Sequence, residues 1–308
     1  MKKASKVLVS IAVVWIVSLT LIVGMLYIFS ETDKSESEIT KKAPWNQKEP
    51  RIKDQRIVPL IPSSTELVCA IGAERYLVAV SDYCNYPPEV VNKLPRIGDQ
   101  NLNIEKIVSL RPTIVLDTNN IHKRYSALFK RLGLNYVNLN IETQEDLPQA
   151  ATILAAHLGD STLSRRFIQD WNKKVQEFKS YKKSNILKPK IYVEIWNNPL
   201  QACGSKNNIH NIVTSAGGIN VFSDIEDFPT VNSEMVIETN PDIILLIYPE
   251  ASMESVKARP GWQNIKAIKN NAVFCIDQDI VVRPSLRNLE AIKQINEIIN
   301  KVNKDEKK

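Results

Sequence analysis

The sequence predicts an α/β protein of two lobes, and a module of helix, stop and strand that occurs twice is the first reason. Residues 103–116 and 232–246 each place a glutamate, Glu105 or Glu234, seven positions before a proline. Because proline disfavours helix for the residue before it, each helix should end there and the β-branched run that follows should enter a sheet. Strand and helix patterns also alternate along the chain, which is typical of mainly parallel sheets covered by helices. The length of 308 residues, 44% of them hydrophobic, suffices for two domains.

The N-terminal segment, residues 1–30, predicts a transmembrane anchor or a signal. Residues 7–29 are uncharged and predominantly apolar, long enough to cross a bilayer core of about 30 Å as a helix. Lysines precede this stretch, and positive charge on a short flank favours the cytoplasm for that end. A cleaved signal peptide is the rival interpretation, although its apolar region is usually shorter and ends in a small-residue cleavage site. Residues 31–55 are polar and predict a flexible tether.

The first lobe is expected at residues 56–160. Residues 56–61 predict a strand, and Ser63 or Ser64 is expected to cap the helix that follows, with Glu66 in its first turn, where the helix dipole favours a carboxylate. The remaining strands and helices of this lobe are expected at residues 77–80, 104–110, 114–116, 121–132, 135–139 and 144–158.

A connecting helix and a second lobe are expected to follow, at residues 161–184 and 185–303. The connector carries a long apolar stripe at helical spacing that includes Trp171, which is most simply a buried helix face. In the second lobe, strands or helices are expected at residues 191–195, 209–215, 234–240, 243–246, 272–276 and 286–302, and strand-end loops at residues 196–206, 227–229 and 277–283. Residues 304–308 predict a disordered basic tail.

Three motifs carry a resemblance to a known family. The stretches RIVPLIPSSTEL at residues 56–67, DYCNYPP at 82–88 and NIEKI at 103–107 resemble the opening of periplasmic binding proteins that serve iron-siderophore, haem and cobalamin ABC importers, and are most similar to the cobalamin-binding members. The resemblance extends to about residue 302. It implies two Rossmann-like lobes joined by one long helix, with the ligand held between them.

The same resemblance implies partners and a location. A substrate-binding protein of this kind delivers its ligand to an ABC permease dimer with a cytoplasmic ATPase. The chain is then expected at the extracytoplasmic face of the cytoplasmic membrane, anchored by its N-terminal helix, or secreted if the signal is cleaved. The expected ligand is a cobalt corrinoid, haem or a ferric chelate, and no cofactor of the protein's own is expected.

Candidate ligand-binding residues come from the strand-end loops, where open α/β sheets bind their ligands. They are Tyr83, Tyr86, Asp99 and Gln100 in the first lobe and Trp196, Phe228, Asp279 and Arg283 in the second. Taken singly, each is as readily explained by packing, Tyr86 beside Pro87 for example. Tyr83 and Arg283 match positions that line the pocket in cobalamin-binding relatives. Asp99 and Phe228 stand where some of those pockets have a tryptophan, which leaves another corrinoid, haem or a siderophore open.

Glu105 and Glu234 have two explanations. A carboxylate in the first turn of a helix gains about 0.3–1 kcal/mol from the helix dipole, which accounts for either one singly. The resemblance implies instead that each glutamate docks on an arginine of the permease. Exposed charge pairs contribute more to the orientation and association rate of two partners than to their affinity. This suits a protein that must bind the permease transiently.

Other classes of site are weakly supported. His122 and His157 fall on expected helices away from the strand-end loops, so a metal site is not expected. Cys84 and Cys203 fall near the expected cleft and their pairing stays open, whereas Cys69 and Cys275 are interpreted as small buried hydrophobic residues.

The class of enzyme considered is a chelatase that inserts metal into tetrapyrroles. The sequence shows no cleft constellation of histidines and acids, no phosphate-binding glycine loop and no nucleophile elbow, so a non-enzymatic receptor is favoured. The net charge of +6 is spread along the chain and accompanies no nucleic-acid-binding module, so no nucleic acid is expected as a partner.

Overall fold

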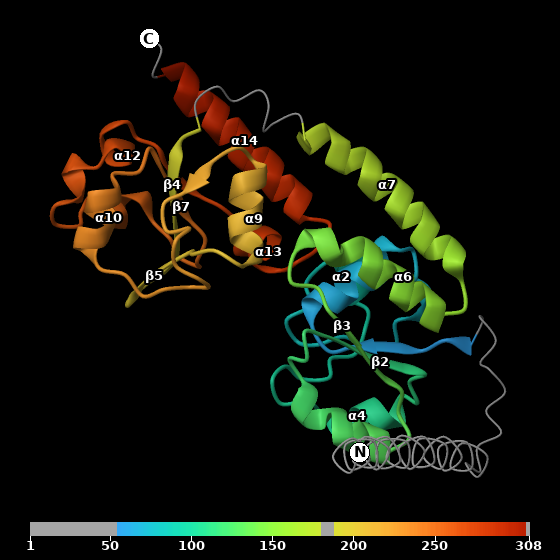
Figure 1. Cartoon of the computed structure of the whole chain (residues 1–308). Coiled ribbons are helices and arrows are strands. Elements are labelled where there is room, and N and C mark those ends of the chain that lie inside the picture. The colour runs from blue at the N-terminus through green and yellow to red at the C-terminus, as the bar shows by residue number, and fades with distance from the viewer. Residues whose placement is uncertain (1–53, 180–187, 306–308) are drawn as a thin grey trace, which may run out of the picture. The chain divides into compact units, whose positions relative to one another are not determined.

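The computed structural model describes residues 54–179 and 188–305, which belong to one compact unit of the chain (Figure 1). The expected anchor and nearly all of the expected tether lie outside these residues. Among the described helices, none is both long enough and apolar enough to span a membrane. We refer to residues 54–160 as the N-terminal region and to residues 188–305 as the C-terminal region.

The N-terminal region is built on a parallel sheet of three strands in the order β1-β2-β3. Its strands and helices are β1 (Ile57–Pro59), α2 (Pro62–Ala70), α3 (Pro88–Val91), α4 (Ile104–Ser109), β2 (Ile114–Thr118), α5 (Ser126–Arg131), β3 (Tyr136–Leu139) and α6 (Leu147–His157). The prediction of a strand at residues 77–80 is wrong. Val78 N–H donates to the Ile57 carbonyl, whereas Val80 N–H donates to the Pro95 carbonyl, each at 3.0 Å. The segment thus divides its hydrogen bonds between two neighbours and forms only isolated bridges.

Helix α2 begins two or three residues earlier than expected, and this places its polar residues within the helix. Pro62 occupies the first turn, and Ile61 is the N-cap residue, without a side-chain cap. Ser64 lies within the helix and donates to the Ile61 carbonyl at 2.8 Å. Glu66 is therefore not in the first turn, so the expectations of a serine cap and of a dipole role for Glu66 are both wrong. Gly72, with φ of 77°, ends this stretch as expected.

Helix α7 (Ser161–Lys179) occupies the position expected for the connector between the two sheets. Leu163, Phe167 and Trp171 are buried along one face, and the rings of Phe167 and Trp171 stack with centroids 6.2 Å apart. The predicted buried face of this helix is confirmed. It packs against α6 and also against the C-terminal helix of the chain, as Figure 1 shows.

The C-terminal region is built on a sheet of five strands in the order β5-β4-β7-β8, with β6 paired to β4. Its elements are β4 (Lys190–Asn197), β5 (Leu200–Ala202), α9 (Asn208–Ser215), β6 (Ile219–Asn220), α10 (Ser233–Thr239), β7 (Ile243–Leu246), α11 (Met253–Lys257), α12 (Lys266–Lys269), β8 (Val273–Cys275), α13 (Gln278–Val282) and α14 (Asn288–Asp305). All pairs are parallel except that of β4 with β5. The prediction of an α/β protein with mainly parallel sheets is confirmed.

Three expected irregular segments are partly regular. The loop expected at residues 196–206 contains the end of β4 and the returning strand β5. The loop expected at residues 277–283 contains α13, which the Asp277 side chain caps by accepting from the Asp279 N–H. Helix α14 includes Lys304 and Asp305, so the tail expected at residues 304–308 is helical at its start.

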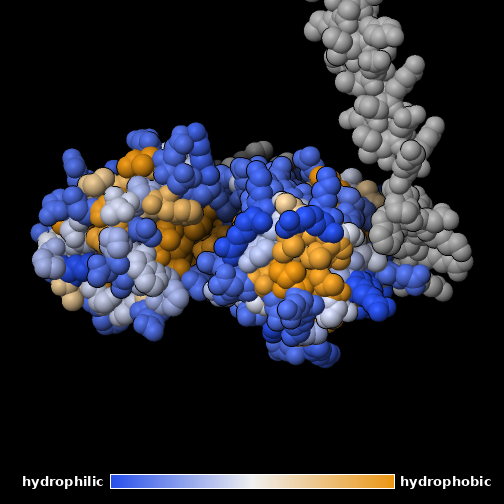
Figure 2. Space-filling view, turned by 90° about the horizontal axis from the view of Figure 1, so that it is seen from below, coloured by the Kyte–Doolittle hydropathy of each residue, from blue (hydrophilic) through white to orange (hydrophobic). Residues whose placement is uncertain are grey.

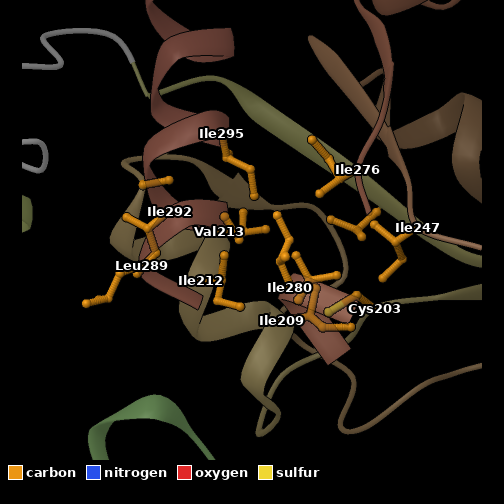
Figure 3. Packing of buried hydrophobic residues seen from close by; sticks show 14 of the residues in the cluster. Cys203, Ile209, Ile212, Val213, Ile247, Ile276, Ile280, Leu289, Ile292 and Ile295 are labelled. Atoms are coloured by element: carbon orange, nitrogen blue, oxygen red, sulfur yellow. The ribbon is translucent and has the colours of Figure 1, made fainter. Parts of the chain in front are cut away.

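The core between α9 and α14 fixes the position of α13. Ile212 and Val213 of α9 pack against Ile292 and Ile295 of α14, and all four are at most 2% exposed (Figure 3). Each fully buried aliphatic side chain of this size contributes about 1.5–3 kcal/mol. Ile280 of α13 lies in the same cluster. The short helix that precedes Arg283 is therefore held against a rigid support.

Candidate ligand-binding cleft

A cavity of about 410 Å³ lies where the carboxyl ends of β1 and β2 face α13. The N-terminal region contributes the turn that enters α2, Tyr83 and residues at and after the end of β2. The C-terminal region contributes Gln278, Asp279, Val282, Arg283 and Pro284. Figure 2 shows a recess between the two regions in which hydrophobic residues gather and whose rim is hydrophilic. The volume is within the usual range of small-molecule pockets, about 300–1,000 Å³, and the position at strand ends is the usual one for open α/β sheets.

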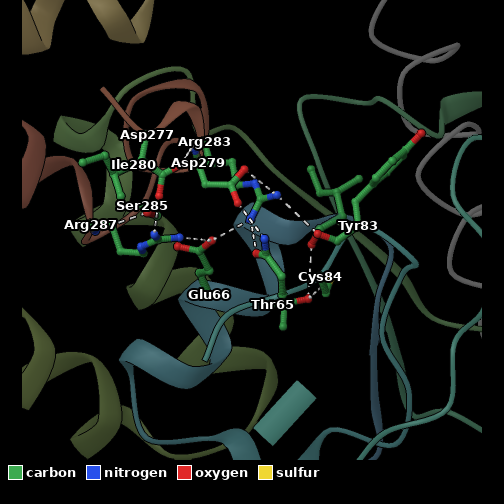
Figure 4. Close-up of polar contacts among 12 residues, drawn as sticks. Thr65, Glu66, Tyr83, Cys84, Asp277, Asp279, Ile280, Arg283, Ser285 and Arg287 are labelled. Carbon is green, nitrogen blue, oxygen red and sulfur yellow. Dashed lines mark hydrogen bonds and ion pairs between the residues drawn. The ribbon is translucent and has the colours of Figure 1, made fainter. Parts of the chain in front are cut away.

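Arg283 joins the two regions at the base of this cleft (Figure 4). Its guanidinium donates to the Asn85 side-chain oxygen at 2.6 Å and to the Tyr83 carbonyl oxygen at 3.3 Å. It also pairs with the Asp279 carboxylate at 2.8 Å. The Asn85 amide donates to the same carboxylate at 2.6 Å. The base of the cleft therefore presents donors and acceptors together, with one positive and one negative charge.

Glu66 is a buried carboxylate on the N-terminal side of this contact. Its side chain is 4% exposed, and the nearest guanidinium nitrogens, of Arg283 and Arg287, lie 3.6 Å and 3.9 Å away. Neither of its oxygens has a hydrogen bond within 3.5 Å among the described residues. Burial raises the pKa of Glu66, against the opposing effects of Ser285 and the two arginines. A single acidic residue in the otherwise uncharged α2 sequence was the signal that could have identified Glu66 as a buried charge. The sequence analysis attributed this residue to the helix dipole instead.

A second cavity, of about 450 Å³, is lined by Glu66 and Arg287 and not by Arg283. It is the larger of the two, but it lies away from the strand ends and collects side chains of both charges, including Lys174 of α7 and Glu290 of α14. Of the residues predicted to bind ligand, it contains Tyr86 alone. We therefore take the smaller cavity, which holds Tyr83, Asp279 and Arg283, as the candidate ligand site.

Asp99 supports Tyr83 from a neighbouring turn. The Tyr83 side chain is 58% exposed, and the neighbouring Asp99 carboxylate raises the pKa of Tyr83. The Asn101 N–H donates to the same carboxylate and lowers the pKa of Asp99. Gly98 opens this turn with φ of 90°, and a Cβ there would lie 2.3 Å from the Asn101 carbonyl oxygen, so the turn requires glycine. Gln100 is exposed and presents its carbonyl oxygen to Arg124.

Trp196 and Phe228 do not line either cavity, although both are 44% exposed. The Trp196 indole N–H donates to the Asn198 carbonyl at 3.0 Å, and its ring meets that of Tyr248 edge-on with centroids 5.9 Å apart. These two aromatic residues lie on the C-terminal region, apart from the cluster around Arg283.

Glu105 and Glu234 occupy equivalent positions in the two regions. Both are exposed in the first turn of their helices, α4 and α10, which Figure 1 shows on different halves of the fold. Asn103 and Asn232 cap these helices, and each side chain accepts a backbone N–H at 2.9 Å. The module that occurs twice in the sequence therefore also has the same cap and the same exposed carboxylate.

The histidines and cysteines correct two expectations. His122 is 4% exposed and lies 3.1 Å from the Asp99 carbonyl oxygen, so the expectation that it lies away from the strand-end loops is wrong. Within the described ranges no cluster of potential metal ligands occurs. All four cysteines are free, and Cys275 is exposed, contrary to expectation. Cys84 and Cys203 are buried, at 2% and 0% exposure, and each sulfur has its own hydrogen-bond partners.

Residues 57–280 match the family described as periplasmic binding protein, which is well over half of the chain. The chain belongs to the periplasmic binding protein family. This confirms the predicted membership and the predicted role as the substrate-binding protein of an ABC importer, and it implies an extracytoplasmic location.

Individual relatives agree with the family. The vitamin B12-binding protein of Vibrio cholerae is 26% identical over 247 residues, covering 78% of this chain and 87% of that protein. An uncharacterised ABC transporter substrate-binding lipoprotein of Bacillus subtilis is 24% identical, covering 87% of this chain and 84% of that protein. The apo structure of a periplasmic haem-binding protein from Roseiflexus is similar with a TM-score of 0.72 at 23% identity, covering 80% of this chain and 98% of that one. The last comparison shows the fold.

Proposed function

We propose that this periplasmic binding protein captures a cobalt corrinoid in the cleft around Arg283 and delivers it to an ABC permease. The observation that supports this ligand is the charge of the cleft. The Arg283 guanidinium is paired with Asp279, so the base offers hydrogen bonds without a free positive charge. A corrinoid carries neutral amide groups on its periphery, which both donate and accept. The vitamin B12-binding relative supports the same choice.

Haem fits the same cleft less well. Its two propionates require cations, and a tyrosine that coordinates haem iron does so as a phenolate. Tyr83 is the tyrosine that lines the cleft, and the neighbouring Asp99 carboxylate raises its pKa and so opposes the phenolate. Ferric catecholate chelates carry negative charge and would need free cations as well. A solved haem-binding neighbour keeps haem as the second candidate.

Equilibrium binding tests the ligand. The full chain is titrated with cyanocobalamin, hemin and a ferric catecholate chelate, with tryptophan fluorescence as the readout. We expect cyanocobalamin to bind most tightly and Arg283→Ala to weaken it at least tenfold, because the substitution removes charge-assisted hydrogen bonds. Lys301→Ala, a substitution on the exposed face of α14, is the matched control for loss of a cation. Tighter binding of hemin, or an Arg283→Ala variant equal to the control, would contradict the proposal.

We also propose that Glu105 and Glu234 dock the protein on the permease. Their equivalent, exposed positions on α4 and α10 support this role, since a two-lobed donor would present one carboxylate to each half of a dimeric permease. Reversing both to lysine is expected to abolish uptake in cells and leave ligand affinity unchanged. Glu238→Lys, also exposed on α10, is the control. Normal uptake by the double variant would reject the role.

Residues 56–160 and 185–303 are proposed as the two lobes, with α7 as a rod that limits their closure to a small movement. Residues 7–29 are proposed as the uncleaved membrane anchor. N-terminal sequencing of the mature protein tests the anchor, and a mature chain that begins near Glu31 would show that the segment is a cleaved signal instead.

A further inference from the structure

The turn that carries Asp99 contacts a short segment, residues 122–125, through its backbone carbonyl groups. The His122 Nε2 atom lies 3.1 Å from the Asp99 carbonyl oxygen. Arg124 donates to the next carbonyl along the turn, that of Gln100. His122 does not itself line the cleft, so its effect on a ligand is indirect.

Asp99 connects this turn to the cleft. Its backbone carbonyl faces His122, and its carboxylate lies close enough to the Tyr83 hydroxyl to raise the pKa of that group. The preceding residue, Gly98, donates to the Asp82 carboxylate at 3.1 Å and accepts from the Asp82 N–H at 3.0 Å, and Asp82 is followed directly by Tyr83. Tyr83 in turn lines the cavity. A displacement of the turn therefore displaces a side chain that borders the ligand site.

Asp117 is the second partner of His122. It lies in β2 with a fully buried side chain and accepts the His122 backbone N–H at 2.8 Å and the Tyr136 hydroxyl at 2.7 Å. The His122 Nδ1 atom lies 3.4 Å from its other oxygen. Burial raises the pKa of Asp117, but the hydrogen bonds from His122 and Tyr136 outweigh it and hold the pKa below its ordinary value. The carboxylate is therefore charged in the folded protein.

Both ring nitrogens of His122 thus face acceptors. A neutral imidazole has one N–H and can donate to one of them, whereas an imidazolium donates to both. A buried cation is costly unless an anion pairs with it, and Asp117 supplies that anion. The other titratable groups that face the site are Tyr125, whose ring centroid is 6.3 Å from that of His122, and Tyr136, whose raised pKa keeps it a donor.

We propose that His122 is a positioning residue that acts as an imidazolium, bridging Asp117 to the Asp99 carbonyl oxygen and so holding Asp99 and Tyr83 in place for the ligand. The proposal rests on the cleft as the ligand site. Loss of the second proton removes one of the two bridging hydrogen bonds, so the turn loosens. Ligand affinity is then highest while the ring is doubly protonated and falls as the pH rises.

Binding of cyanocobalamin by the full chain at pH 6 and pH 9 tests the effect on the cleft. We expect the wild-type affinity to fall about tenfold between these values, since a hydrogen bond to a charged group is lost. The His122→Gln variant keeps a neutral donor near the Nε2 position and should bind with an affinity that does not change with pH. His157→Gln, on the exposed surface of α6, should follow the wild type. A wild-type affinity that does not change with pH, or a His122→Gln variant that follows the wild type, overturns the proposal.

A second measurement needs no ligand, so it separates this proposal from the proposed function. Nitrogen-15 NMR of the ring nitrogens in the full chain is expected to show two N–H groups on His122 at pH 6, with a coupling across the hydrogen bond to the Asp99 carbonyl. Asp117→Asn should remove the second N–H. If cyanocobalamin and hemin both fail to bind but the two N–H groups are present, the proposed function fails and the role of His122 in holding the turn stands. A single N–H on His122 at pH 6 overturns that role whatever the ligand.

Discussion

Two buried carboxylates, Glu194 in β4 and Glu66 in α2, face arginines in very different ways. Arg259 donates to both oxygens of Glu194, at 2.6 Å and 2.7 Å. The guanidinium nitrogens of Arg283 and Arg287 approach Glu66 no closer than 3.6 Å and 3.9 Å. Both carboxylates are almost fully buried, at 0% and 4% exposure, so the difference lies in the partners and not in the depth.

The aromatic surroundings show the same contrast. Arg259 lies over the ring of Trp262 and Arg287 over the ring of Tyr86, each 4.5 Å from the centroid. Trp262 is fully buried, whereas Tyr86 is 39% exposed. The Glu194 pair lies within the C-terminal region, whereas Glu66 meets arginines from the other region. The first pair therefore stabilises one folded core, and the second is a looser contact between the two regions.

The largest expected effect comes from breaking the tight pair. Glu194→Gln leaves the Arg259 guanidinium buried without its counter-charge, and removal of one partner of a buried ion pair costs about 3–5 kcal/mol. Urea denaturation of the full chain, followed by tryptophan fluorescence, measures the free energy of unfolding. A loss below 1 kcal/mol would mean that the pair is solvated in solution and would remove the contrast with Glu66.

A smaller loss of stability is expected from removing one of the two tyrosine hydroxyls that donate to the same carboxylate, those of Tyr192 and Tyr248. Tyr248 donates to Glu194 at 2.9 Å, and hydrogen bonds to charged groups contribute about 1.5–3 kcal/mol. Tyr248→Phe should therefore cost about 2 kcal/mol by the same denaturation measurement. Tyr136→Phe, which removes a donor at 2.7 Å from Asp117 in the N-terminal region, is the matched comparison and should cost a similar amount. A Tyr248→Phe variant as stable as the wild type would show that Glu194 does not depend on this donor.

The sequence predicted the alternation of elements because local patterns determine it. The repeated glutamates and prolines and the apolar stripe of α7 are all contained within a few turns of chain. The short helix α13 was missed because five residues are too few to show a helical period. The hairpin of β4 with β5 was missed because the second strand is short and its sequence is also compatible with a loop.

The site was harder to predict than the fold. Tyr83, Asp279 and Arg283 were predicted from their positions in strand-end loops, and all three line the candidate cavity. Glu66 and His122 were assigned to other roles, since the groups that give them a function lie on different elements and no local spacing identifies them. A charged residue can be recognised as buried only when the residues that surround it in the fold are known.

Glu66→Gln is expected to change stability less than the substitutions at Glu194 and Tyr248, and to change its dependence on pH. Burial raises the pKa of Glu66 in the folded state above its unfolded value. The stabilising effect of its proton is therefore fully present below the unfolded pKa and is lost as the pH rises through the folded pKa. The wild type should lose stability relative to Glu66→Gln as the pH rises above the ordinary pKa of a glutamate carboxyl, which urea denaturation at a series of pH values measures. Parallel stability curves for the two proteins would show that the carboxyl is not desolvated in solution.

The smallest effect on stability is expected for Tyr86, whose partly exposed ring lies beneath Arg287. Tyr86→Leu removes the ring beneath Arg287 and keeps a side chain against the same surface, and a cation–π contact at an exposed site contributes about 0.5–1 kcal/mol. Tyr83→Leu is the control, because the Tyr83 ring is exposed and no arginine lies over it among the described cation–π contacts. This control should lower ligand affinity without the loss of stability expected for Tyr86→Leu. Because Arg287 also faces Glu66, the Tyr86→Leu loss should shrink in the Glu66→Gln background if the ring orients the guanidinium toward the carboxylate. Equal losses in both backgrounds would mean that Tyr86 and Glu66 act on Arg287 independently, and the contact between the regions would then be a set of separate pairs and not one coupled network.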